Sequence, residues 1–144
     1  MKRFAFPLET ALAWRFRQLE LEEAQLQALF GEREAFLSAK RRLSHDLAKE
    51  ETLLTGAIMN AEQLAALDRF RRHVAARNLR LDAAISECEQ RIEAQRARVN
   101  EARRQHELLD RLRGKALAEW TAAEAREQEQ LAAELYLARC VRDR

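Results

Sequence analysis

Only one proline and three glycines interrupt this chain of 144 residues. Glycine and proline are the residues that most often mark turns, so their scarcity argues against a compact domain with many short elements. The commonest residues, among them alanine, leucine, glutamate and arginine, are instead those that favour long helices. Charged residues make up 35% of the chain, which suits helices with much exposed surface. The sequence therefore predicts an all-α fold of a few long helices.

Apolar side chains recur at heptad spacing in both halves of the chain. In the first half the row consists of Leu12, Leu19, Leu26, Leu47 and Leu54, with Arg33 and Lys40 at its middle positions. In the second half, alternating steps of four and three residues give Leu81, Ile85, Cys88, Ile92, Gln95, Val99, Ala102, His106, Leu109, Arg113, Ala116 and Trp120. After Trp120 the row shifts phase to Leu131, Leu135 and Ala138. Such a repeat is typical of coiled coils.

One turn separates the two patterns. Gly56 is predicted to end the first helix in the left-handed conformation, and Asn60 with Gln63 forms a capping-box pattern that begins the second. We therefore expect a helix over about 8–54, a turn over about 55–60 and a helix over about 61–138. Residues 1–144 would form a single domain, a long antiparallel two-helix coiled-coil hairpin.

The two expected helices differ in length. At 1.5 Å per residue the first would measure about 70 Å and the second about 120 Å, so they cannot pair end to end. Two arrangements remain open. Either the C-terminal part of the second helix extends beyond the N-terminus, or residues 60–80 fold as a short extra helical segment near the turn.

Composition also argues against several classes of function. The formal net charge is only +2, which argues against nucleic-acid binding. No apolar run is long enough for a membrane span, and no secretory signal is evident. Cys88 and Cys140 are expected to be free thiols in a reducing cytosol. The residues show no metal-ligand spacing and no catalytic motif, so we expect no metal, no cofactor and no enzymatic activity.

Several motifs resemble the FliJ family, the coiled-coil component of the bacterial flagellar type III export apparatus. The N-terminal part of the likeness is Phe4-x-Phe6-x-Leu8-Glu9, followed by Leu12, Arg15 and Glu23-Ala24. It continues with a loop near residue 56, a segment with Leu67, Phe70 and Val74, and a tract with Glu119-Trp120, Glu124, Arg126-Glu127 and Glu129. The resemblance covers the whole chain.

The resemblance implies a hairpin similar to the gamma stalk of rotary ATP synthases and a set of protein partners. FliJ proteins insert their paired terminal helices into the ring of the hexameric export ATPase FliI, contact the export-gate protein FlhA, and bind export chaperones. The implied location is the cytoplasm, in peripheral association with the inner face of the cell membrane at the flagellar base.

Two candidate partner-binding sets follow. By position, the resemblance implies that Leu67, Phe70, Val74 and Arg77 contact the export gate. They lie in an arginine-rich segment, whose alternative interpretation is an amphipathic helix packed on the hairpin. The N-terminal set is Arg3, Phe4, Phe6 and Arg15, a basic and aromatic group for which the resemblance implies contact with the ATPase ring. Its alternative is pairing with the acidic C-terminal tract, which would fix the antiparallel register.

Two further functions are compatible with the same pattern. One is the stalk of an injectisome secretion system, the YscO type, which gene neighbourhood would distinguish. The other is a structural coiled-coil dimer unrelated to secretion, which the mass in solution would distinguish, because a self-contained hairpin is monomeric.

Overall fold

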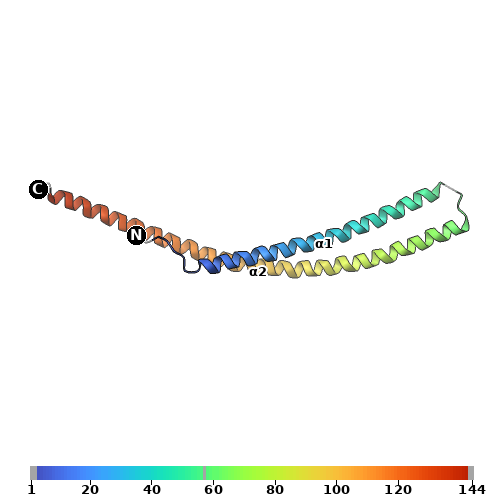
Figure 1. Cartoon of the computed structure of the whole chain (residues 1–144), viewed down its shortest axis with the longest axis horizontal. Helices are drawn as coiled ribbons and strands as arrows, with labels where there is room; N and C mark the ends of the chain where they lie inside the picture. Colours follow the sequence, from blue (N-terminus) through green and yellow to red (C-terminus); the bar gives the residue numbers. More distant parts are fainter. Residues whose placement is uncertain (1–2, 57, 143–144) are drawn as a thin grey trace. The chain divides into compact units, whose positions relative to one another are not determined.

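The computed structural model describes residues 3–56 and 58–142, and these residues form two long helices without any strand. Helix α1 spans Glu9–Thr55 and α2 spans Ala61–Arg142. They pack against each other as an antiparallel hairpin (Figure 1), which confirms the predicted fold class. Because α2 is continuous through residues 61–80, no separate helical segment forms near the turn.

The start of α2 is fixed by the predicted capping box. The backbone N–H of Gln63 donates to Asn60 Oδ1 over 2.8 Å, and the N–H of Asn60 donates to Gln63 Oε1 over 3.2 Å. Two N–H groups that a helix terminus would leave unpaired are thereby satisfied reciprocally.

The start of α1 is a turn built around Pro7. The N–H of Glu9 donates to the Phe6 carbonyl over 3.2 Å, which places Pro7 at the second position of a four-residue turn. Proline favours this position because its ring already fixes φ near the required value. The Leu8 carbonyl then accepts the first helical bond, from the N–H of Leu12.

The prediction that Gly56 ends α1 in the left-handed conformation is wrong. None of the described glycines has a positive φ. Near the end of α1, threonine hydroxyls donate to carbonyls of the last turns: Thr52 donates to Ala48, and Thr55 donates to Glu51 and, over 3.3 Å, to Thr52. Gly56 therefore contributes low helix propensity rather than a special backbone conformation.

Contacts divide the described chain into two units. We call residues 21–56 and 58–99 the loop unit, and residues 3–20 and 100–142 the terminal unit. Each unit contains one stretch of α1 and one of α2.

Cross-helix ion pairs define the antiparallel register of the loop unit. Arg71 Nε lies 2.9 Å from Glu51 Oε1, and Arg91 lies 3.1 Å from Glu32. Lys40 pairs with Asp82 between them. Each step forward along α1 is matched by a similar step back along α2. These pairs are partly exposed, so they select register more than they stabilise the fold.

Within the terminal unit, the contacts between α1 and α2 also have an antiparallel order. Glu9 pairs with Arg113 over 3.0 Å, and the ring of Phe16 lies 5.5 Å from that of His106. The extended segment before Pro7 follows α2 further, because the Phe4 ring contacts Trp120 at 5.9 Å.

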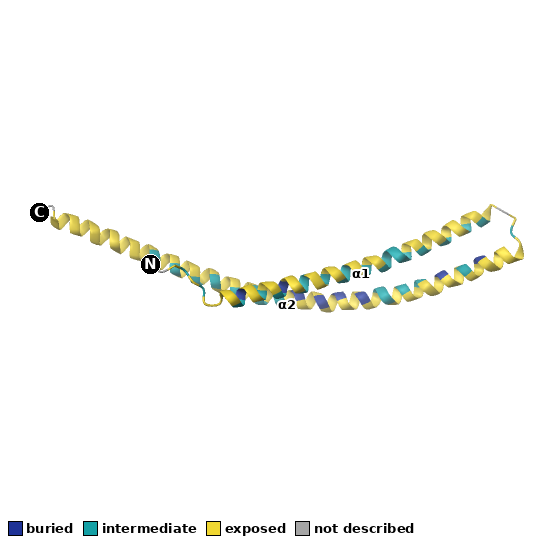
Figure 2. Ribbon diagram, viewed as in Figure 1, coloured by how far each residue is buried: buried dark blue, intermediate teal, exposed yellow. Residues whose placement is uncertain are grey.

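The buried interface between the helices, which we call the seam, is narrow (Figure 2). In the loop unit the buried residues are Leu67, Val74, Cys88, Ile92, Gln95 and Val99, and in the terminal unit they are Leu12 and Leu19. Most of these positions belong to the heptad rows in the sequence. Burial is therefore confined to a row of single side chains, as expected for two helices without a third layer.

Candidate partner-binding surfaces

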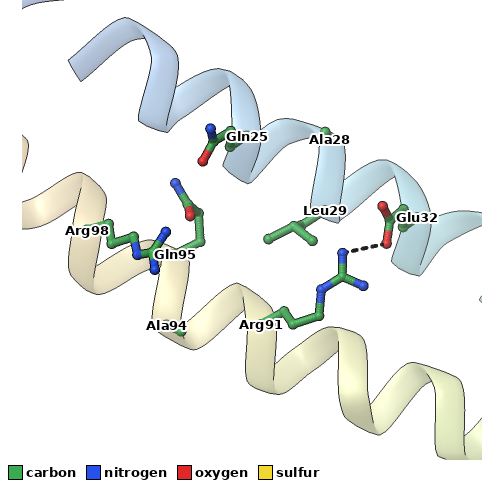
Figure 3. A pocket seen from close by; sticks show the side chains of 8 residues that line it. All are labelled: Gln25, Ala28, Leu29, Glu32, Arg91, Ala94, Gln95 and Arg98. Carbon is green, nitrogen blue, oxygen red and sulfur yellow. Dashed lines mark ion pairs between the residues drawn. The ribbon is translucent and has the colours of Figure 1, made fainter. Parts of the chain in front are cut away.

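Two helices provide grooves and exposed faces rather than an enclosed cavity. One groove of the loop unit has a volume of about 410 Å³ and lies where α1 and α2 face each other (Figure 3). Its lining consists of Gln25, Ala28, Leu29, Glu32, Arg91, Ala94, Gln95 and Arg98. The ion pair between Glu32 and Arg91 crosses it. These charges already satisfy one another, so the groove is held together by internal contacts.

Gln95 is a polar side chain in the middle of the seam, with 6% exposure. Its amide nitrogen donates to the backbone carbonyl of Glu22 over 3.0 Å and also to the Glu22 carboxylate. Two turns away, the buried thiol of Cys88 donates to the Leu29 carbonyl over 3.4 Å. The heptad row identified the position of Gln95, but its partner on α1 became evident only in the structure.

Three of the four residues expected at the export gate lie in the seam or at its edge. Leu67 is 6% exposed and Val74 is 2% exposed, and Phe70 is half-buried. Leu67 and Phe70 line a groove of about 310 Å³ with Leu54 of α1. These side chains therefore pack within the hairpin, as the amphipathic-helix alternative expects, and only Arg77 is exposed.

The exposed face of the same segment is basic. Arg69, His73, Arg77 and Arg80 follow one another at steps of four, four and three residues, so they share one side of α2. The neighbouring arginines are engaged, because Arg71 pairs with Glu51 and Arg72 pairs with Asp68 over 2.8 Å. We call Arg69, His73, Arg77 and Arg80 the basic stripe.

A shallow groove accompanies the basic stripe. Its volume is about 350 Å³, and it is lined by His73, Ala76, Arg77, Arg80, Leu81 and Ala84. The small alanines leave room beside the charged groups. An acidic helix or extended peptide could lie there, with its carboxylates next to the guanidinium groups.

The four residues expected at the ATPase ring lie in the terminal unit and differ in accessibility. Arg3 is exposed, whereas Phe4 and Phe6 are half-buried, and Phe4 contacts Trp120. Arg15 is half-buried and donates to Gln105, and its guanidinium also lies 4.8 Å from the Trp14 ring centroid. Arg3 is thus the member of this set whose charge is most available to a partner.

The two tryptophans differ in their exposure. Trp120 is half-buried against Phe4, but Trp14 is 52% exposed on the outer side of α1. Trp14 falls two residues after Leu12, which places it roughly opposite the seam on a helix.

The described residues offer no constellation for metal binding. No three side chains among the described His, Cys, Asp and Glu residues gather closely enough to hold a metal ion. Within the same residues, neither helix contains a stretch that is apolar over a membrane-spanning length.

Surfaces that are open to a partner include the basic stripe, the exposed Arg3 and the part of α2 beyond Trp120. Comparisons of the chain with models of known families, with curated proteins and with solved structures found no match.

Proposed function

We propose that the chain is a FliJ-like stalk of the bacterial flagellar type III export apparatus. It would act without catalysing a reaction itself, by binding the hexameric export ATPase with its terminal unit and the export gate with its loop unit. It would also escort export chaperones, and it would work in the cytoplasm at the membrane face of the flagellar base.

The observation that most supports this proposal is the architecture of the terminal unit. An aromatic segment at residues 3–6 lies along α2, and α2 continues well beyond Glu9, where α1 begins. A long helix reinforced at one stretch by a second helix suits insertion into a ring. A ring of six subunits around one asymmetric stalk has mismatched symmetry, so each subunit would meet a different face. Such a mismatch could promote ring assembly or ordered hydrolysis.

The proposal assigns the two candidate surfaces to different partners. Arg3 would contact the ATPase ring, because it is the exposed charge of the N-terminal set. The basic stripe would contact the gate through Arg77, and the groove beside it would accept an acidic segment of the gate protein. Leu67, Phe70 and Val74 would contribute indirectly, by fixing α2 against α1.

Hydrolysis by a purified flagellar export ATPase, measured with and without this chain, tests the first assignment. We expect the chain to increase the rate, and we expect Arg3→Glu to weaken the stimulation about tenfold at subsaturating concentration, which corresponds to about 1.4 kcal/mol of binding. The matched control is Arg42→Glu, an exposed arginine of the loop unit. Equal stimulation by both variants would reject the Arg3 contact, and absence of binding and stimulation by the unaltered chain would reject the function.

Binding to the cytosolic part of an export-gate protein tests the second assignment. Arg77→Glu should weaken binding about tenfold, whereas the control Arg98→Glu, on an exposed position elsewhere on α2, should leave it unchanged. The gate assignment fails if the two variants bind equally well. Circular dichroism of each variant should show unchanged helix content, because both arginines are exposed.

A further inference from the structure

The last part of α2 has no helix packed against it in the described structure. Residues 125–142 are exposed throughout, although they include several large apolar side chains (Figure 2). Leu131 is 58% exposed and Leu135 is 66% exposed. A helix that leaves such residues in water has an apolar face that a second surface could cover.

The apolar face follows a heptad row with charged ends. Its centre is Leu131, Leu135 and Ala138, at steps of four and three residues. The same steps lead back through Gln128 to Glu124, and forward to Arg142. The row is therefore acidic at its start, apolar in the middle and basic at its end.

We infer that residues 121–142 of two copies of this chain pair as antiparallel helices. In the antiparallel register centred on the apolar pair, Leu131 lies against Leu135 of the second copy. The same register places Gln128 against Ala138 of the second copy, and Glu124 against Arg142 of the second copy. Because the arrangement is two-fold symmetric, every one of these contacts occurs twice.

Other registers lack this complementarity. Moving the second copy by one heptad places either Glu124 or Arg142 against a leucine, which would desolvate an unpaired charge. In a parallel pair, Glu124 would face Glu124 of the second copy, and Arg142 would face Arg142 of the second copy. These like charges would repel each other. Charge complementarity therefore selects a second copy in one register as the occupant of this face.

The pairing is expected to be weak. A helix of 22 residues is about 33 Å long, and only two leucines of each copy lie at the centre of the contact. The surface area that two such helices bury against each other falls at the small end of the range for specific protein interfaces. Glu134 would also lie close to Glu134 of the second copy near the symmetry axis. Removal of this repulsion by Glu134→Gln should tighten the dimer.

This inference and the proposed function use the same stretch of α2, but the inference is argued only from the charges and exposure of residues 121–142 and does not need the function to hold. It can be tested on the full chain by sedimentation equilibrium, at concentrations from about 5 to 500 µM, a range suited to a weak interface. We expect a reversible monomer–dimer equilibrium. The variant Leu131→Gln/Leu135→Gln should raise the dissociation constant at least tenfold, and the control Leu137→Gln, on the outer side of the same helix, should leave it unchanged.

Charge exchange tests the register. Glu124→Arg alone and Arg142→Glu alone should each weaken the dimer several-fold, and the double variant Glu124→Arg/Arg142→Glu should restore it. Full restoration is expected only where the two positions face each other between copies. A chain that stays monomeric over the whole range, a Leu137→Gln effect equal to that of the leucine pair, or a double variant as weak as the single ones would each overturn the inference.

Discussion

At the scale of single residues, Gln95 is the position where the seam depends on a specific polar contact. Its amide donates to two oxygens of Glu22, one of them on a carboxylate. A hydrogen bond to a charged group in a partly desolvated seam contributes more than one on the surface. A polar residue at a heptad position can also fix the register of the two helices.

We therefore predict that Gln95→Ala lowers the free energy of unfolding by about 1–2 kcal/mol. Chemical denaturation followed by far-ultraviolet circular dichroism measures it. Gln27→Ala makes the same chemical change at an exposed position of α1, and it should alter stability by less than about 0.5 kcal/mol. If the two variants were equally stable, the Gln95 contact would contribute nothing to the fold.

Gly114 lies inside α2, where a glycine lowers the stability of the helix relative to alanine. A Cβ built at this position meets no atom within 4 Å, and its φ is not positive. Gly114→Ala should therefore stabilise the protein by about 0.5–1 kcal/mol, because alanine restricts the unfolded chain and favours helix. Thermal unfolding of the variant checks this, and a lower midpoint would show that the helix is irregular at that residue.

At the scale of elements, the ends of the helices could be predicted from the sequence to different extents. Asn60 and Gln63 have a pattern whose hydrogen bonds involve only neighbouring residues, so the capping box could be predicted. The backbone conformation of Gly56 could not be predicted, because a glycine after a helix is compatible with several conformations and the sequence does not choose among them. The threonine hydroxyls near it provide an alternative set of hydrogen bonds.

The two ends of the turn should respond differently to alanine. Asn60→Ala removes the Oδ1 acceptor of the Gln63 N–H and should cost about 1 kcal/mol of stability. Gly56→Ala should cost nothing, because the backbone there is not left-handed and the added Cβ has open space. A loss of about 1 kcal/mol or more in Gly56→Ala would instead indicate the left-handed conformation. Urea denaturation of the two variants in parallel distinguishes these outcomes.

Candidate sites were harder to predict than elements. Leu67 and Val74 have the spacing of a docking face and of a seam alike, because both need apolar residues on one side of a helix. Their burial against α1 depends on the pairing register, which long-range contacts set. The exposure of Trp14, likewise, follows from which side of α1 faces α2. The basic stripe became distinct only when ion pairs removed Arg71 and Arg72 from the set of available arginines.

At the scale of the whole molecule, the account depends on one chain folding back on itself. Scarce glycine and proline, the heptad rows and one capped turn are sufficient to predict two helices in a hairpin. The unequal lengths of the helices left two arrangements open, and the continuity of α2 through residues 61–80 excludes the one with a separate segment. A long unpaired helical stretch is the consequence, and it is the feature that both proposals use.

The most direct test of the hairpin is a distance between spin labels at positions 35 and 87. These are exposed positions at the same level of α1 and α2 in the loop unit, as the neighbouring ion pairs of Glu32 with Arg91 and Lys40 with Asp82 show. Helix axes in contact are about 8–10 Å apart, so the labels should lie within about 25 Å of each other. In one uninterrupted helix they would be about 80 Å apart. The hairpin predicts a short distance that persists in excess unlabelled protein, whereas a short distance that disappears on such dilution, or a long one, would contradict it.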